Sequence, residues 1–173
     1  IDSERLEKED NLAAVFQEIS GILVPGGFGS RGVLGMVRTA EYARENGIPY
    51  LGICLGMQIM VIEYARNVLG LEEADSSEFA PDSPHPVISL LEDQVDVQNY
   101  GGTMRLGSNQ SLLQEGSLIR AAYGAEVISE RHRHRYEVNN RYRERLSEAG
   151  LSIVGTTTDG NLVESVQWPK HPW

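Results

Sequence analysis

The only cysteine of the 173-residue chain, Cys54, stands between two glycines in the stretch Gly52-Ile53-Cys54-Leu55-Gly56. The apolar run 48–53 predicts a buried strand and residues 58–69 predict a buried helix, so Cys54 falls in a sharp turn between them. Small residues two positions before and after are typical of a nucleophile elbow. The helix N-terminus would lower the pKa of the thiol and offer the Leu55 amide to an oxyanion. The alternative is a buried structural cysteine.

A glycine-rich loop precedes this elbow in the sequence. Gly27, Gly29 and Gly32 match the pattern G-x-G-x-x-G between a predicted strand at 21–25 and a predicted helix at 33–45. A dinucleotide site would also need an acidic residue at the end of the next strand, where this chain has the cysteine instead. Such a loop can also expose backbone amides to an anionic oxygen. We therefore expect Gly27 to complete an oxyanion hole with Leu55.

A basic segment with period-two alternation follows at residues 130–138. As a strand it places Arg131, Arg133 and Arg135 on one face, and two histidines with a tyrosine on the other. A solvated edge strand and a two-histidine metal site are the alternatives. No carboxylate ligand is marked nearby, so we predict no metal site. In a chain this acidic, the favoured interpretation is an anion-binding strand beside the active site.

The elements that must position these residues follow an α/β order, which predicts a mostly parallel central sheet flanked by helices. In such sheets ligands bind at the carboxyl ends of the strands, where both special turns fall. A small antiparallel hairpin is predicted near the C-terminus. Helices are also expected at 10–20 and 139–149, a strand at 86–91, and the strands of the hairpin at 151–156 and 162–168. Polar loops are expected at 70–86 and 92–100, and either a β-turn with a strand or a ligand loop at 101–108.

Composition restricts the possible partners and setting. A chain of this length with 40% hydrophobic residues predicts one domain. The net charge of −10 argues against nucleic acid or an anionic membrane as the main partner. One cysteine cannot form an intramolecular disulfide, and the sequence shows no signal peptide or apolar run of membrane-spanning length. These features predict a cytoplasmic protein.

Four motifs together carry a family resemblance. The stretches 25–29 and 52–58 are similar to those of class I (triad) glutamine amidotransferases generally, and 101–107 and 131–139 narrow the resemblance to the glutamine amidotransferase domains of CTP synthases. The resemblance implies a flavodoxin-like three-layer fold. It implies that a domain with this fold hydrolyses L-glutamine and has no cofactor of its own. It also implies a synthetase domain of the same polypeptide that uses ATP and Mg to aminate UTP, a homotetramer, and GTP as activator.

The resemblance also implies roles for individual residues. Cys54 would be the nucleophile that forms a thioester, Glu78 would meet the ammonium of glutamine and Arg135 its carboxylate. The other matched positions are Gly27 and Leu55 in the oxyanion hole, Phe28, Gln58 and Tyr136 around the substrate, and Thr103 and Arg105 in a lid linked to GTP activation.

The chain departs from this family pattern in several places. The family's catalytic His and Glu lie in a Gln-Phe-His-Pro-Glu segment that the 173 residues do not contain, and we expect its first strand and helix to be absent as well. His171 resembles the residue preceding that segment and is not expected to be the base. We therefore expect one incomplete domain at 1–173, with an open cleft at Cys54 and no activity alone. The alternatives are a cysteine hydrolase using His132 or His134, and a non-catalytic binding module.

Overall fold

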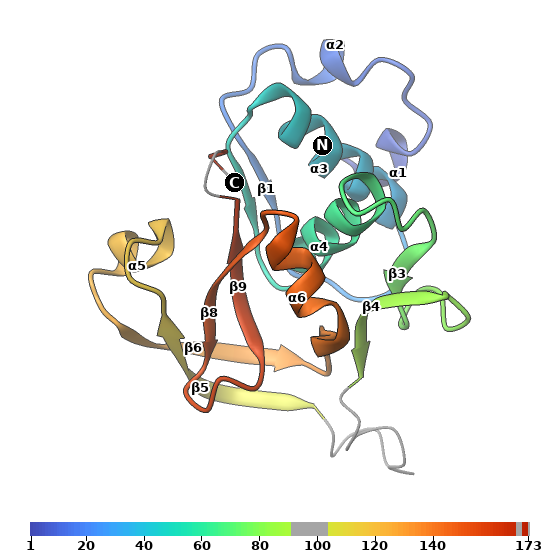
Figure 1. Ribbon diagram of the computed structural model, residues 1–173. Helices are drawn as coiled ribbons and strands as arrows, with labels where there is room; N and C mark the ends of the chain where they lie inside the picture. Colours follow the sequence, from blue (N-terminus) through green and yellow to red (C-terminus); the bar gives the residue numbers. More distant parts are fainter. Residues whose placement is uncertain (91–103, 169–170, 173) are drawn as a thin grey trace.

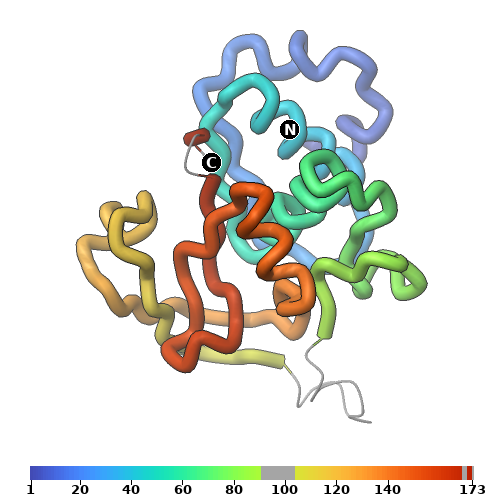
Figure 2. The backbone as a smooth tube through the Cα atoms, viewed as in Figure 1, coloured from blue at the N-terminus to red at the C-terminus, as the bar shows by residue number. Residues whose placement is uncertain are grey.

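The computed structural model describes residues 1–90, 104–168 and 171–172. Figure 1 shows the long helices α3 and α4 packed beside the short strands β1 and β2, while an antiparallel sheet extends away from them and carries α5 at its far end. The trace in Figure 2 shows the last part of the chain returning to the region where β1 and β2 lie. A backbone hydrogen bond joins the two regions, because Tyr50 N on β2 donates to Pro172 O at 3.1 Å.

A parallel pair of strands forms the part of the fold that leads to the cysteine. Strand β1 (Ile22–Val24) pairs in parallel with β2 (Tyr50–Gly52), and α3 (Val33–Asn46) connects them. Gly32 and Gly47 bound α3 in the left-handed conformation that glycine adopts without steric cost. Helix α4 (Leu55–Asn67) begins directly after the elbow. This confirms the predicted order of strand, glycine loop, helix, strand, elbow and helix.

Helix α4 is the centre of the hydrophobic core. Ten of its residues are buried, among them Ile59, Val61 and Ile62 with no measurable exposure. A helix that is apolar on all sides must be covered on all sides. The core around it also includes Val87, Val138 and residues from most other elements.

The middle of the chain forms a three-stranded mixed sheet. Strand β3 (Ala74–Ser76) pairs in parallel with β4 (His85–Leu90), which pairs antiparallel with β7 (Tyr136–Val138). The strand expected at 86–91 is thus confirmed as β4. The predicted polar loop at 70–86 contains β3, a strand too short and too polar to show a period.

A four-stranded antiparallel sheet corrects the predicted mostly parallel architecture. Its order is β6-β5-β8-β9, formed by β5 (Arg105–Leu113), β6 (Val127–His134), β8 (Ser152–Thr157) and β9 (Val163–Gln167). The hairpin β8–β9 was expected, but it is only half of this sheet. Alternation along 130–138 indicates a strand but carries no information about the direction of the strand that pairs with it. In the structure β6 pairs antiparallel with β5, and helix α5 (Leu118–Tyr123) lies between the two in the sequence.

The predicted helix at 10–20 is too long. The structure has α1 (Ser3–Leu6) and α2 (Leu12–Phe16), and Phe16 is the only side chain of α2 that is buried. One buried residue offers little packing energy to extend a short helix. Helix α6 (Asn140–Glu148) lies as expected. Among the described residues, no helix is long and apolar enough to cross a bilayer.

Candidate active site

The backbone at Cys54 has the strained geometry of an elbow. Its φ of 53° and ψ of −106° make it the only non-glycine residue with positive φ in the part of the chain that the structure describes. A Cβ on Gly52 would lie 2.4 Å from the Gly56 backbone, and one on Gly56 would lie 2.1 Å from the Val24 carbonyl oxygen. Both positions therefore require glycine, which confirms the elbow that the spacing predicts.

The thiol of Cys54 faces two backbone amides and two carboxylates. Burial raises its pKa above the ordinary value, and the charges of Glu137 and Glu78 act in the same direction. The N–H groups of Leu55 and Gly27 hydrogen-bond to the sulfur and partly offset this. The expectation of a lowered thiol pKa is therefore wrong for this structure, because burial and two carboxylates outweigh two amides. The role of the two amides in an oxyanion hole remains a prediction.

A cavity of about 210 Å³, here called the thiol cavity, opens beside Cys54. Residues far apart in the sequence meet there, including all five of those that the family resemblance marks around the substrate. Its lining consists of Gly27, Phe28, Cys54, Gln58, Glu78, Met104, His134, Arg135 and Tyr136. Sequence reasoning missed Met104 and the contribution of His134, although Met104 lies inside the glycine-flanked motif and His134 inside the basic one. The roles assigned to these residues remain predictions.

Two hydrogen bonds hold the walls of the thiol cavity together. Gln58 on α4 donates from Nε2 to the Tyr136 carbonyl oxygen at 3.1 Å, which ties the elbow helix to β7. Glu78 Oε1 accepts from Gly29 N at 3.0 Å, which ties the segment after β3 to the glycine loop. Both residues thus shape the cavity in the absence of any ligand.

The structure describes one of the two predicted lid residues. Thr103 lies outside the described residues. Arg105 is at the start of β5 with its side chain partly buried: Nη1 is 3.0 Å from Glu137 Oε1 and Nη2 is 2.8 Å from Glu164 Oε1. Its role toward GTP remains a prediction.

The two histidines of the basic strand contact each other through their ring nitrogens. His132 Nδ1 is 2.8 Å from His134 Nε2, and His134 Nδ1 is 3.3 Å from Glu137 Oε1. Both ring nitrogens of His134 are therefore directed toward other side chains, although the residue lines the thiol cavity. His171 Nε2 lies 2.9 Å from the Ala43 carbonyl oxygen. Within the described ranges, no cluster of three or more His, Cys, Asp or Glu side chains is arranged to hold a metal ion.

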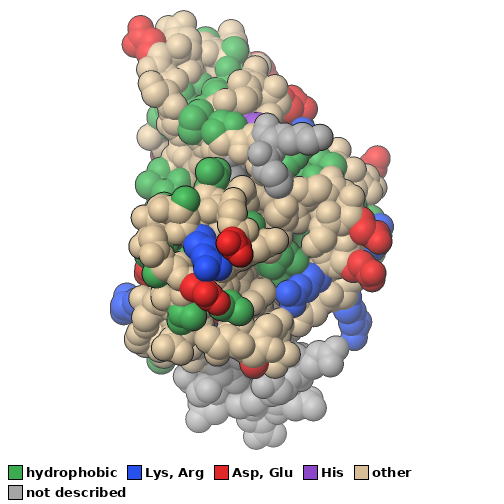
Figure 3. Space-filling view, turned by 60° about the vertical axis from the view of Figure 1, so that its left-hand side comes forward, with side chains coloured by type: hydrophobic (Ala, Val, Ile, Leu, Met, Phe, Trp, Pro, Cys, Tyr) green, Lys and Arg blue, Asp and Glu red, His purple; other side chains and the backbone are tan. Residues whose placement is uncertain are grey.

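A larger cleft of about 670 Å³ borders Cys54 from another side, as expected for an open site. Strand β2 and strand β9 line it, and its lining also includes part of α5. Exposed hydrophobic side chains, including Leu51, Ile53 and Leu118, lie on its rim. The space-filling view in Figure 3 shows hydrophobic side chains exposed on the face that is turned forward there.

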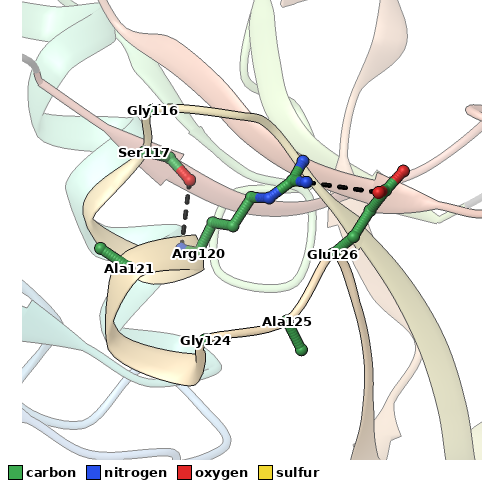
Figure 4. Close-up of a pocket in the computed structure, with 7 residues that line it drawn as sticks. All are labelled: Gly116, Ser117, Arg120, Ala121, Gly124, Ala125 and Glu126. Atoms are coloured by element: carbon green, nitrogen blue, oxygen red, sulfur yellow. Dashed lines mark hydrogen bonds and ion pairs between the residues drawn. The ribbon is translucent and has the colours of Figure 1, made fainter.

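A third cavity, of about 320 Å³, lies at α5 and shares no lining residue with the thiol cavity. Figure 4 shows the Arg120 side chain crossing it to Glu126, with 3.3 Å between Nη2 and Oε2. Ser117 Oγ accepts from Arg120 N at the start of the helix. These contacts explain the local fold, and nothing at this cavity resembles a reaction centre.

Comparison with known proteins gives a consistent result. The family model described as glutamine amidotransferase class-I matches residues 2–173. The chain is 58% identical over all 173 residues to a protein named CTP synthase from Carboxydothermus hydrogenoformans, and 51% identical over the same length to CTP synthase from Listeria monocytogenes. It spans 32% of the length of these relatives.

Solved structures agree with the sequence comparisons. The glutaminase domain of Trypanosoma brucei CTPS with bound acivicin superposes with a TM-score of 0.92 at 40% identity, covering 99% of this chain and 67% of that one. A protein described as a putative GMP synthase subunit from Thermoplasma acidophilum superposes with a TM-score of 0.61 at 13% identity, covering 99% of this chain and 65% of that one. The second likeness concerns the fold alone.

Proposed function

Because the chain belongs to the class I glutamine amidotransferase family, in the branch formed by the glutaminase domains of CTP synthases, we propose that it hydrolyses L-glutamine through a thioester on Cys54. The observation that carries the proposal is the thiol cavity. There the sulfur in its elbow faces the Leu55 and Gly27 amides in a cavity also lined by Glu78 and Arg135. Acyl transfer needs an activated nucleophile and preorganised donors for the oxyanion.

The proposed chemistry begins with attack of the Cys54 thiolate on the carboxamide carbon of glutamine. A carbon–sulfur bond forms, the amides of Gly27 and Leu55 stabilise the negative oxygen, and the carbon–nitrogen bond breaks as the nitrogen leaves with a proton as ammonia. Water then hydrolyses the thioester to glutamate and regenerates the thiol. Glu78 and Arg135 would hold the ammonium and carboxylate ends, while Phe28, Gln58 and Tyr136 shape the cavity.

A general base is the part that the described residues do not supply. Neither ring nitrogen of His134 is directed at the sulfur, because one faces His132 and the other faces Glu137. We propose that the base belongs to a Gln-Phe-His-Pro-Glu segment of the full protein, a segment that these 173 residues do not contain. The cleft of about 670 Å³ beside Cys54 offers space for it.

The activity of a whole protein is a further step of the proposal, since the chain spans about a third of its curated relatives. Ammonia would pass to a synthetase domain of the same polypeptide, which aminates UTP to CTP with ATP and Mg. GTP would activate the reaction through the segment that includes Thr103 and Arg105. The working assembly would be a homotetramer.

A labelling experiment tests the proposal. An electrophilic glutamine analogue should label Cys54 of the full-length protein once per chain, and Cys54→Ser should lose both labelling and glutamine-dependent synthesis but keep synthesis from free ammonia. Labelling that persists in Cys54→Ser would contradict the proposed nucleophile. Glutaminase turnover by the 173-residue chain that disappears in His134→Ala would instead favour a hydrolase with its own histidine base. A chain that binds glutamine but is never acylated would be a binding module.

A further inference from the structure

Five ionisable side chains from four strands form a cluster beside the thiol cavity, which His134 lines. We call it the buried network: Arg105 on β5, His132 and His134 on β6, Glu137 on β7 and Glu164 on β9. Their side chains are between 3 and 16% exposed. Charges with so little exposed surface are tolerated only when they are paired and hydrogen-bonded. All but Arg105 also line the cleft of about 670 Å³, and contacts among the five residues supply pairing.

The contacts within the network leave one position for an additional proton. His132 Nε2 is 3.6 Å from Glu164 Oε2, so the carboxylate favours a proton on that nitrogen. His132 Nδ1 then accepts from His134 Nε2–H across 2.8 Å. This leaves a lone pair on His134 Nδ1, which is buried and lies 3.3 Å from Glu137 Oε1, while the Tyr136 backbone also acts on this imidazole.

Protonation of Glu137 resolves this arrangement. Both contacts of Glu137 fall on the same oxygen, Oε1, which as a hydroxyl donates to His134 Nδ1 at 3.3 Å and accepts from Arg105 Nη1 at 3.0 Å. Charge also balances, because the guanidinium of Arg105 is then matched by the carboxylate of Glu164 alone, 2.8 Å from Nη2.

Titration behaviour agrees with this assignment. Burial raises the pKa of Glu137 to about 7, against a partial offset from Arg105. Burial and the neighbouring charges of His132 and Arg105 lower the pKa of His134 to about 4. Burial also lowers the pKa of His132, Arg105 acts in the same direction, and Glu164 and Glu130 act in the opposite direction. Near neutral pH the imidazoles are thus neutral and a substantial fraction of Glu137 retains a proton.

The network is adjacent to the groups proposed to act on glutamine. Glu137 directly follows Arg135 and Tyr136 in the chain, and His134 lines the thiol cavity beside them. A negative charge on Glu137 also disfavours the thiolate of Cys54, as does the charge on Glu78. The protonation state of Glu137 therefore affects both the wall of the cavity and the nucleophile.

We propose that Glu137, His134, His132, Glu164 and Arg105 form a proton-sharing positioning network in which Glu137 is the neutral, protonated member and Glu164 the charged one. This inference rests on the proposed glutaminase function and adds to it. The network holds the wall that carries Arg135 and Tyr136, and it keeps negative charge away from Cys54.

The test compares two amide substitutions in the full-length protein. Glutamine is neutral like a protonated glutamate, but its nitrogen only donates and its oxygen only accepts, so at the position of Oε1 it keeps the contact with His134 or the one with Arg105. Glu137→Gln should therefore raise the KM for glutamine by no more than about threefold, whereas Glu164→Gln leaves Arg105 without its counter-charge and should raise that KM about tenfold. Glu137→Ala should raise the KM as Glu164→Gln does. Ammonia-dependent synthesis should not change in any of them.

A second readout follows the thiol directly. The rate of Cys54 alkylation by iodoacetamide, measured on the Cys54 peptide by mass spectrometry, should rise with pH through a midpoint about one unit lower in Glu137→Gln than in wild type. The matched control is Glu126→Gln, which removes a carboxylate from an exposed pair with Arg120 and should change neither readout.

Two results would overturn the inference. One is a KM that rises at least as much in Glu137→Gln as in Glu164→Gln, and the other is an alkylation midpoint that does not move in Glu137→Gln. Either result, together with loss of glutamine use in Cys54→Ser, would reject the network and leave the glutaminase function standing. Retention of glutamine use in Cys54→Ser would reject the function itself. If Glu137→Ala fails to fold, the comparison of Glu137→Gln with Glu164→Gln still tests the inference.

Discussion

Cys54 combines backbone strain with an environment that opposes ionisation. A left-handed conformation costs a non-glycine residue of the order of 1–3 kcal/mol and persists only where the surroundings hold it. The surroundings here are two glycines that let α4 approach β1 and β2 closely. The raised pKa means that the thiol needs help to ionise, from substrate, from a base or from a change of charge nearby. This is compatible with a nucleophile that reacts only when the site is complete.

The Gly56 position provides a direct test of the elbow. Gly56→Ala would place a Cβ 2.1 Å from the Val24 carbonyl oxygen, so α4 must shift away from β1. We expect labelling of Cys54 by an electrophilic glutamine analogue to fall by at least about tenfold, and the free energy of unfolding to fall by about 1–3 kcal/mol.

The control for this prediction is Gly21→Ala. There a Cβ would lie 3.4 Å from the Pro49 carbonyl oxygen, and labelling should be unchanged. Equal labelling of wild type and Gly56→Ala would mean that the elbow tolerates displacement and that its strain has no part in the reaction.

Helices α3 and α4 are joined by a buried ion pair. Arg44 Nε on α3 donates to Glu63 Oε1 on α4 at 2.8 Å, and the Glu63 side chain has no exposed surface. Burial raises the pKa of Glu63, while hydrogen bonds from Asn67 and Arg44 partly offset this. The pair aligns the helix that begins at Cys54 with the helix that follows the glycine loop.

Removing one partner should be costly because it leaves the other charge buried. Arg44→Met is expected to lower the free energy of unfolding by about 3–5 kcal/mol at pH 7, measured by chemical denaturation. Glu45 also contacts Arg44 but is exposed, so Glu45→Gln should change stability by less than about 0.5 kcal/mol. Similar losses of unfolding free energy in both variants would show that the buried pair contributes no more to stability than the exposed contact.

The stability of the whole molecule should depend on pH through two opposing groups. The pKa of Glu137 rises from 4.5 to about 7 on folding, so the folded state binds more protons and stability falls as pH rises through this interval. The pKa of His134 falls from 6.5 to about 4, so the unfolded state binds more protons and stability rises with pH. The two contributions largely cancel between pH 4.5 and 6.5.

Single variants should reveal each contribution. As pH rises from 4.5 to 7, the free energy of unfolding of Glu137→Gln is expected to increase by about 3 kcal/mol relative to wild type. As pH rises from 4 to 6.5, that of His134→Asn is expected to decrease relative to wild type by a similar amount. Chemical denaturation at several pH values measures both. A Glu126→Gln control should show a constant difference from wild type, and parallel curves for all variants would contradict the opposing titrations.

The sequence by itself determined the features that depend on neighbouring residues. The elbow follows from two glycines flanking Cys54, because its turn is a property of five consecutive residues. The glycine loop and helices α3, α4 and α6 follow from local spacing and apolar periodicity in the same way. The family motifs add the residues around the thiol cavity, since each motif is itself a local pattern.

Only the tertiary structure decided which strands pair and which charges meet. The direction of β5 against β6 depends on contacts across α5, and this pair is antiparallel in a fold that was predicted to be mostly parallel. Arg105 meets Glu164 across 59 positions of sequence, and no local pattern relates them. The sign of the Cys54 pKa shift likewise follows from burial and from two carboxylates brought near by folding. Pairing, burial and charge arise from the whole arrangement because each depends on residues that are distant along the chain.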